Sequence, residues 1–480
     1  MAKNILFLTG KLAEKSLHKT LEDITSPNAS SSNSCVPSFK YRVQQMGVSV
    51  AALMTPQLIA RRLSDVGDAD KVIIPGLCQG DLTSLQAQLG IPVERGPNDL
   101  KDLPQFFGNK PKNADLSQYD VRIFAEIVDA PQLSVAAIVA KAEKFKAQGA
   151  NVIDLGCLPN SPFGHMQESI QALKHAGLEV SVDSMQVDEL LNAGKAGADY
   201  LLSLTEKTLW LTDEVASIPI LISAKPGTLP SLFRAIDQLI AQNKPFIADA
   251  ILDPIPFGFT NSLLRYQKLR RKYPDIQIMM GVGNLTELTD ADTTGINALL
   301  FGLISEMKIN AVLATSVSPH AINAIAEADI ARRIMYAARE DIRLPRGYSK
   351  GLLGLHDRRP FSYSNDEIQN MASLIKDPSF RIQVNEAGVH VYNRDGLHTA
   401  IDPFVLYPNL GVENDASHAF YLGVELARAQ IAWQLKKKYQ QDEMLEWGVT
   451  EIKKDETQSH REASLNEKKS KLKNDQLKQS

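Results

Sequence analysis

Short apolar segments alternate with segments of helical periodicity through the middle of the chain, and this pattern restricts the fold more than any other feature. Between Val121 and residue 340 the alternation repeats eight times. Strands that alternate with helices predict an α/β fold with a parallel sheet. Eight such units favour a (β/α)8 barrel, which usually needs about 250 residues. A doubly wound sheet is the alternative, although it would more often show fewer strands and an early glycine fingerprint.

The expected elements follow from this repeat. The strands are expected at VRIFAEIV, NVIDLG, LEVSVD, ADYLLSL, IPILIS, FIADAILD, IQIMMG and NAVLAT. The helices are expected to begin near Leu133, Met166, Val187, Leu209, Leu229, Asn261, Thr293 and His320.

The regions on either side of the barrel have different patterns. Residues 1–115 predict a small α/β domain, in which Thr55 caps a helix over TPQLIARRLSD. The barrel is assigned to residues 116–340, and residues 341–379 are expected to form a loop-rich linker. Residues 380–448 predict an α+β region with a hairpin in FRIQVNEAGVHVYNRDG and a long helix over HAFYLGVELARAQIAWQLKKKY. Residues 449–480 are rich in Lys, Glu, Gln and Ser and predict a disordered tail.

Composition excludes several classes of protein. The net charge of −4 gives no general reason to expect nucleic-acid binding. The apolar runs are shorter than the roughly 20 residues of a membrane helix, so no membrane span is expected. The three cysteines, Cys35, Cys78 and Cys157, lie far apart and fit a reduced, cytoplasmic compartment. A homo-oligomer is left open.

Polar residues stand where the expected strands end. In a barrel these carboxyl ends meet at one mouth, where active sites lie. Carboxylates without partners are costly to bury, so the mouth predicts a ligand rich in hydrogen-bond donors or a metal ion. No His/Asp pair has the spacing of metal ligands, so no metal is firmly implied. The residues at the strand ends are Asp129, Asp154, Asp183, Ser203, Lys225, Asp253 and Asn284.

A reduced pterin is a ligand rich in hydrogen-bond donors and would suit this mouth. Its pyrimidinone edge presents a ring N–H beside an exocyclic NH2, so one carboxylate can accept both hydrogen bonds. An asparagine both donates and accepts, so Asn284 can bind a ring nitrogen and the carbonyl group together. The other interpretations remain open: Asp183 and Asp253 could be helix N-caps, and Asp154 could be a buried structural group.

The stretch GVGN, residues 281–284, also has two interpretations. It could be a phosphate loop, but Thr286 stands where a dinucleotide fingerprint needs its third glycine. Alternatively, the glycines leave room for a flat ligand and Asn284 binds its edge. We expect the second, because the next helix is predicted only near Thr293, whereas a phosphate loop opens a helix at once.

Three motifs at the strand ends resemble the pterin-binding superfamily of dihydropteroate synthases and methyltetrahydrofolate:corrinoid methyltransferases. They are EVSVDSM, ILDPIPFGF and the segment from GVGN to TSVSP. The resemblance implies that Asp183, Asp253 and Asn284 bind pterin. Asp154 and Ser203 are expected to belong to the same pterin-binding site. Further segments, including LFLTGKLAE, IPGLCQGDL and DASHAFYLGVELARAQIA, resemble the dihydropteroate synthase-related proteins of methanogenic archaea and methylotrophic bacteria. That family is associated with the biosynthesis of tetrahydromethanopterin, a one-carbon carrier.

The chain also departs from the synthase pattern. After the second strand, CLPNSPFGH replaces the Ser-Thr-Arg-Pro loop of a synthase, and the Ser-Arg-Lys run of the seventh strand is absent.

The catalytic candidates are Lys225 and Asp129. Lys225 is also expected to bind an anion, together with the basic residues Arg346, Lys350, Arg358 and Arg359.

Three functions therefore compete. The first is a transferase that joins a reduced pterin to an arylamine or arylamine phosphate. The second is a methyltransferase that uses a methylated pterin and a corrinoid partner, in which Asn284 stabilises the protonated N5. The third is a non-catalytic pterin carrier or scaffold.

Overall fold

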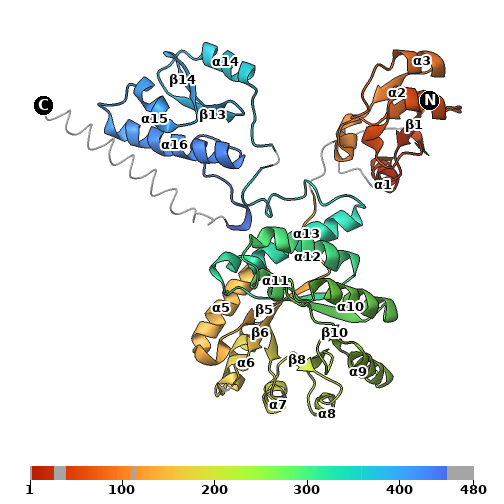
Figure 1. The fold of residues 1–480 in the computed structure, drawn as a ribbon, viewed down its shortest axis with the longest axis vertical. Helices are drawn as coiled ribbons and strands as arrows, with labels where there is room; N and C mark the ends of the chain where they lie inside the picture. The colour runs from red at the N-terminus through yellow and green to blue at the C-terminus, as the bar shows by residue number, and fades with distance from the viewer. Residues whose placement is uncertain (1–2, 26–38, 110–113, 160, 358, 451–480) are drawn as a thin grey trace. The chain divides into compact units, whose positions relative to one another are not determined.

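The computed structural model describes residues 3–25, 39–109, 114–159, 161–357 and 359–450 (Figure 1). The chain divides into two compact units, Met1–Asp120 with Arg332–Tyr348, and Val121–Ala331 with Ser349–Ser480. Cys35, Arg358 and nearly all of the predicted tail lie outside the described residues. Among the described helices, none combines the length and the apolar character that a membrane span requires.

The first unit contains a parallel four-stranded sheet in the order β2-β1-β3-β4. Alternate residues of β1 face opposite sides of this sheet: Ile5 and Phe7 pack with α1, whereas Leu6 and Leu8 pack with α2 and α3. Thr55 caps α2 as predicted, because its hydroxyl accepts a hydrogen bond of 3.2 Å from the Leu58 amide. The elements are β1 (Lys3–Thr9), α1 (Glu14–Thr25), β2 (Phe39–Gln45), α2 (Pro56–Arg62), β3 (Lys71–Ile74), α3 (Thr83–Leu89), β4 (Val93–Arg95) and α4 (Leu103–Phe106).

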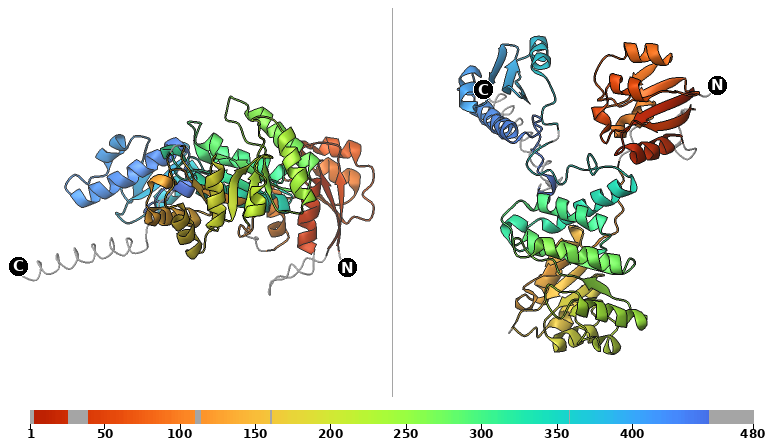
Figure 2. Two further views of the ribbon diagram at one scale, coloured as in Figure 1. Left: turned by 90° about the horizontal axis from the view of Figure 1, so that it is seen from below. Right: turned by 45° about the vertical axis from the view of Figure 1, so that its right-hand side comes forward.

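The second unit contains a closed barrel of eight parallel strands, which confirms the predicted fold class. Figure 2 shows the same strands and helices from two further directions. All eight strands lie within the segments expected from the sequence. They are β5 (Arg122–Ile127), β6 (Val152–Gly156), β7 (Glu179–Asp183), β8 (Tyr200–Leu204), β9 (Ile218–Leu221), β10 (Ile247–Asp249), β11 (Gln277–Gly281) and β12 (Ala311–Ala314).

A helix follows each barrel strand, as the alternation predicts. Most begin within a few residues of the expected position, but α8 is a single turn and a short extra helix, α11, precedes α12. The helices are α5 (Val135–Ala147), α6 (Met166–His175), α7 (Val187–Lys195), α8 (Leu211–Glu214), α9 (Pro230–Ala241), α10 (Phe259–Lys272), α11 (Gly283–Thr286), α12 (Thr293–Glu306) and α13 (Ala324–Glu340).

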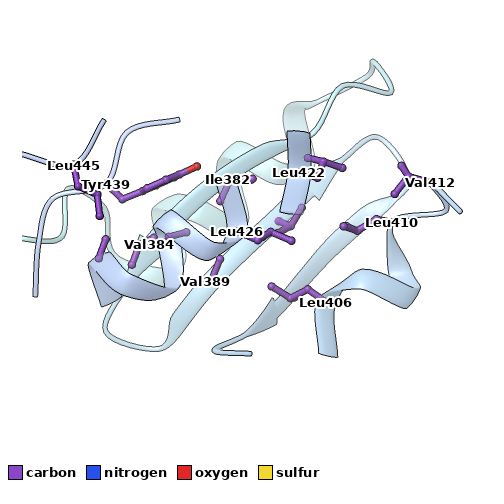
Figure 3. Packing of buried hydrophobic residues seen from close by; sticks show 13 residues of the cluster. Ile382, Val384, Val389, Leu406, Leu410, Val412, Leu422, Leu426, Tyr439 and Leu445 are labelled. Carbon is purple, nitrogen blue, oxygen red and sulfur yellow. The ribbon is translucent and has the colours of Figure 1, made fainter. Parts of the chain in front are cut away.

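The C-terminal region forms its own apolar core (Figure 3). Its antiparallel sheet has the order β13-β14-β15, and the predicted hairpin is present with Glu386 and Ala387 between its strands. Leu422 and Leu426 of α16 pack against this sheet. Residues 341–379, expected to be loop-rich, also contain α14, whose first turn carries a capping box between Ser364 and Glu367. The elements are α14 (Asn365–Leu374), β13 (Arg381–Asn385), β14 (Gly388–Asn393), β15 (Gly396–Ala400), α15 (Pro403–Leu406) and α16 (Ala416–Leu435).

Candidate functional site

The interior of the barrel changes from apolar to polar toward the carboxyl ends of the strands. Phe124, Val152, Ile247 and Met279 belong to one buried apolar cluster. Side chains two residues apart on a strand point to the same face. The interior positions two residues further along are therefore Glu126, Asp154, Asp249 and Gly281.

A cavity of about 520 Å³ opens at these strand ends. This volume lies within the usual range for small-molecule sites. Of the residues predicted from the sequence, Asp183, Ser203 and Asn284 line it together. The other residues that line it are Glu126, Val128, Leu202, Ile220, Ile222, Asp249, Ile251, Leu252, Gly281, Gly283, Glu287, Leu288, Leu313, Thr315, Val317 and Ser318.

Three carboxylates meet beside this cavity, and two of them, Glu126 and Asp183, line it. Glu126 on β5 is paired in register with Asp154 on β6, and Asp183 ends β7 beside Gly156. One oxygen atom from each of the three carboxylates lies within 4.8 Å of the other two. A Cβ atom at Gly156 would lie 3.0 Å from Oε1 of Glu126. Glycine at this position therefore leaves space for the Glu126 carboxylate.

Burial dominates the electrostatics of this cluster. It raises the pKa of Glu126 to about 7, with further contributions from Asp183 and Glu287. Burial also raises the pKa of Asp183 to about 6. For Asp154, burial and the charges of Asp183 and Glu126 hold the pKa well above its ordinary value, and the neighbouring Ser181 hydroxyl lowers it. Three ionised carboxylates at this separation are therefore unfavourable unless a cation or several hydrogen-bond donors accompany them.

Asp249 supplies the carboxylate of the sixth strand. Its Oδ1 atom accepts hydrogen bonds from the Tyr266 hydroxyl at 2.5 Å and from the Ile251 amide at 2.7 Å. Oδ2 takes part in neither bond. Burial raises the pKa of Asp249 to about 6, against the effect of these two bonds and of Arg265.

Asp253, which the sequence predicts at the mouth, does not line the cavity. Its Oδ2 atom forms an ion pair of 2.9 Å with Arg265, which also donates to the carbonyl oxygens of Ala250 and Ile251. The predicted strand FIADAILD is too long, because β10 already ends at Asp249. The expected cavity between Asp183, Asp253 and Asn284 is therefore corrected: Asp183, Asp249 and Asn284 line it, and Asp253 does not.

Asn284 lies on the cavity as predicted, but the local structure differs from the prediction. A one-turn helix, α11, begins at Gly283, whereas the sequence predicts the next helix only near Thr293. The Nδ2 atom of Asn284 donates a hydrogen bond of 2.6 Å to the carbonyl oxygen of Leu252. A Cβ atom at Gly281 would meet no atom within 4 Å, whereas one at Gly283 would lie 2.5 Å from Oγ1 of Thr315. Gly281 thus faces open space, whereas a side chain at Gly283 would require Thr315 to move.

The two catalytic candidates from the sequence lie outside the cavity lining. Asp129 forms an ion pair of 3.2 Å with Lys141 of α5. The Lys225 side chain is exposed in the connection between β9 and α9. Among the residues predicted to bind an anion, Lys350 forms an ion pair of 2.9 Å with Glu446.

Sequence reasoning missed three carboxylates that line the cavity: Glu126, Asp249 and Glu287. The first two carry a detectable signal, because each follows a buried apolar residue by two positions on the same strand. Glu287 accepts hydrogen bonds from the amides of Val317 and Ser318. Burial alone would raise the pKa of Glu287, but the Ser318 side chain, these two amide bonds and the charge of His320 together hold it below its ordinary value.

Comparison with known proteins gives relatives of low identity. Residues 3–98 match a family of unknown function, DUF6513. The chain is 26% identical to the uncharacterized protein MJ0107 of Methanocaldococcus jannaschii, over 91% of this chain and 98% of that protein.

Similar solved structures include dihydropteroate synthases. That of Anaplasma phagocytophilum, with bound 6-hydroxymethylpterin-monophosphate, is 16% identical, with a TM-score of 0.35 over 45% of this chain and 99% of that one. The Yersinia pestis enzyme with a pterine-sulfa conjugate is 14% identical, with a TM-score of 0.35 over 47% and 95%. Mycobacterium tuberculosis Rv1207 is 17% identical, with a TM-score of 0.35 over 47% and 94%.

Proposed function

We propose that the mouth of the barrel binds a reduced pterin and that the chain is a pterin-dependent transferase. The observation that carries this proposal is the placement of Asp183, Asp249 and Asn284 around one cavity. Two of these residues belong to the motifs that resemble the pterin-binding superfamily. The proposal does not depend on Asp253.

The chemistry of the lining supports a pterin. Asp183 is a desolvated carboxylate with a raised pKa, and two adjacent N–H donors of an aminopyrimidinone ring would compensate its charge. Nδ2 of Asn284 is used by the Leu252 carbonyl group, so its Oδ1 atom is the group that can accept from a ring N–H. Open space beside Gly281 suits a flat ring.

The charge of the lining bears on the group that is transferred. The arylamine condensation predicted from the sequence expels diphosphate from the pterin, and positive charge is needed to stabilise such a leaving group. The described residues that line the cavity include four carboxylates and no Lys, Arg or His. The acidic lining instead favours the second candidate, methyl transfer from the protonated N5 of a methylated pterin to an acceptor such as a corrinoid on a partner protein.

Binding and turnover should be tested separately with the full-length protein. Tetrahydropterin and its 5-methyl derivative are titrated by fluorescence, with Asp183→Asn as the test variant and Asp188→Asn, an exposed carboxylate on α7, as the control. We expect saturable binding that Asp183→Asn weakens at least tenfold and that the control retains. Absence of saturable binding by the wild type would contradict the proposal.

Turnover is then assayed with a pterin diphosphate plus an arylamine, and with a methyl-pterin plus a reduced corrinoid. Product in the second assay supports methyl transfer, and product in the first restores the condensation. Binding without product in either assay would indicate a carrier and overturn the transferase assignment.

A further inference from the structure

Asp154 is the most unusual residue of the acidic cluster. Its side chain is fully buried, and neither of its carboxylate oxygens has a hydrogen-bond partner. The hydroxyl group of Ser181, which pairs with Asp154 in the strand register, is also buried; it lies near enough to lower the pKa of Asp154, but it makes no hydrogen bond of ordinary geometry to either carboxylate oxygen. Buried polar groups are nearly always satisfied, so an unpartnered carboxylate indicates a ligand that the protein atoms do not supply.

The geometry around Asp154 suits a small cation. Its carboxylate, and those of Glu126 and Asp183, each place an oxygen atom within 4.8 Å of the other two. Oxygen ligands on opposite sides of a cation are about 4.2 Å apart around Mg²⁺ and about 4.8 Å apart around Ca²⁺, given their usual bond lengths. A proton shared between two carboxylates would leave the third without a partner.

We propose that Glu126, Asp154 and Asp183 bind one hard divalent cation, such as Mg²⁺ or Mn²⁺, beneath the floor of the cavity. Carboxylate oxygens are the ligands that these ions prefer, whereas zinc sites usually include His or Cys. Glu126 and Asp183 line the cavity and Asp154 does not. The ion would therefore lie between Asp154 and the cavity, with coordination positions left for water or for a bound molecule.

The mouth stays acidic with the ion in place. Asp249 and Glu287 also line the cavity, so one divalent cation does not reverse the formal charge of these five carboxylates. The inference does not depend on the identity of the organic ligand, because the three metal ligands all belong to this chain.

The test is a Mn²⁺ titration of the chelator-treated full-length protein, followed by the loss of the free Mn²⁺ signal in electron paramagnetic resonance. We expect one bound ion per chain, displaced by excess Mg²⁺. Asp154→Asn keeps the size of the side chain and removes its charge, and it should weaken Mn²⁺ binding at least tenfold. Asp188→Asn, on the exposed face of α7, is the matched control and should bind as the wild type does.

Glu126→Gln provides a second variant, because Glu126 is less buried than Asp154 and its replacement disturbs the core less. Circular dichroism shows whether each variant is folded. Wild-type protein without stoichiometric Mn²⁺ binding, or folded Asp154→Asn and Glu126→Gln variants with unchanged affinity, would overturn the inference. Pterin titration of the same samples separates this result from the proposed function, since pterin binding without Mn²⁺ binding contradicts the metal site alone.

Discussion

Nδ2 of Asn284 donates a 2.6 Å hydrogen bond to the carbonyl oxygen of Leu252. This bond joins the turn after β11 to the segment that follows β10. Because a carbonyl oxygen only accepts, the amide group of Asn284 must present its nitrogen to Leu252 and leave Oδ1 for another donor. One contact thus connects two strand ends and determines which atom of Asn284 a ligand can use.

Replacement of Asn284 should separate these two roles. Asn284→Ala removes both groups and should weaken pterin binding about tenfold at every pH, the loss of roughly one hydrogen bond. Asn284→Asp places a carboxylate against the Leu252 carbonyl oxygen, so it should bind poorly at neutral pH and recover as the pH falls and the new carboxyl group becomes a donor. Fluorescence titration between pH 5 and 8 measures this. Equal affinity of Asn284→Asp and the wild type at pH 8 would contradict the assigned orientation.

Asp249 and Asp253 give opposite expectations. Asp249→Asn alters a carboxylate on the cavity and should weaken pterin binding more than it changes the melting temperature. Asp253→Asn removes the charge that pairs with Arg265, so it should mainly lower the melting temperature. Isothermal titration and thermal unfolding of both variants distinguish the two positions. A larger loss of pterin affinity in Asp253→Asn would instead support the role that the sequence motif implies.

The two glycines of the GVGN turn should also respond differently to alanine. Gly281→Ala adds a methyl group to open space, so the protein should keep its melting temperature and lose pterin affinity. Gly283→Ala places a methyl group 2.5 Å from Oγ1 of the buried Thr315, and should destabilise the fold by about 1–3 kcal/mol. Urea unfolding measures the second effect. Equal stability of the two variants would show that Thr315 moves aside without cost.

Asp249 should contribute to the pH dependence of stability. Its folded pKa of about 6 lies above the ordinary value of 3.8, because burial outweighs the hydrogen bonds from Tyr266 and Ile251 and the charge of Arg265. The folded state therefore binds more protons than the unfolded state between these values, and the free energy of unfolding falls as the pH rises through this window.

Asp249→Asn removes this proton binding. The stability of the variant relative to the wild type should therefore increase between pH 4 and pH 7, as measured by urea unfolding in buffer with a chelator. A stability difference that stays constant over this range would contradict the raised pKa.

The sequence by itself determined an α/β fold with a parallel sheet, favoured a barrel over a doubly wound sheet, and placed polar groups at the carboxyl ends of the strands. Eight apolar segments of strand length alternate with helical ones, and this number favours a closed barrel because a doubly wound sheet more often has fewer strands. Asp183 and Asn284 were identified because they directly follow or end apolar runs, where the chain must leave the barrel. Glu126 and Asp249 could also have been predicted from the sequence. Side chains two positions apart on a strand share a face, and these two residues follow buried Phe124 and Ile247 by two positions.

Tertiary structure alone decided which polar residues meet. Asp249 and Asp253 both stand near the end of one apolar run, and the sequence does not distinguish them. In the folded chain, Arg265 of α10 forms an ion pair with Asp253. Tyr266 of the same helix donates a hydrogen bond to Asp249, which lines the cavity. The distance between Glu126, Asp154 and Asp183 depends on the register of three strands, which local sequence does not encode. Lys225 has the sequence position of a mouth residue but an exposed side chain. Sequence pattern determines which face of a strand is buried, whereas contacts between side chains far apart in the chain determine where each charge finds its partner.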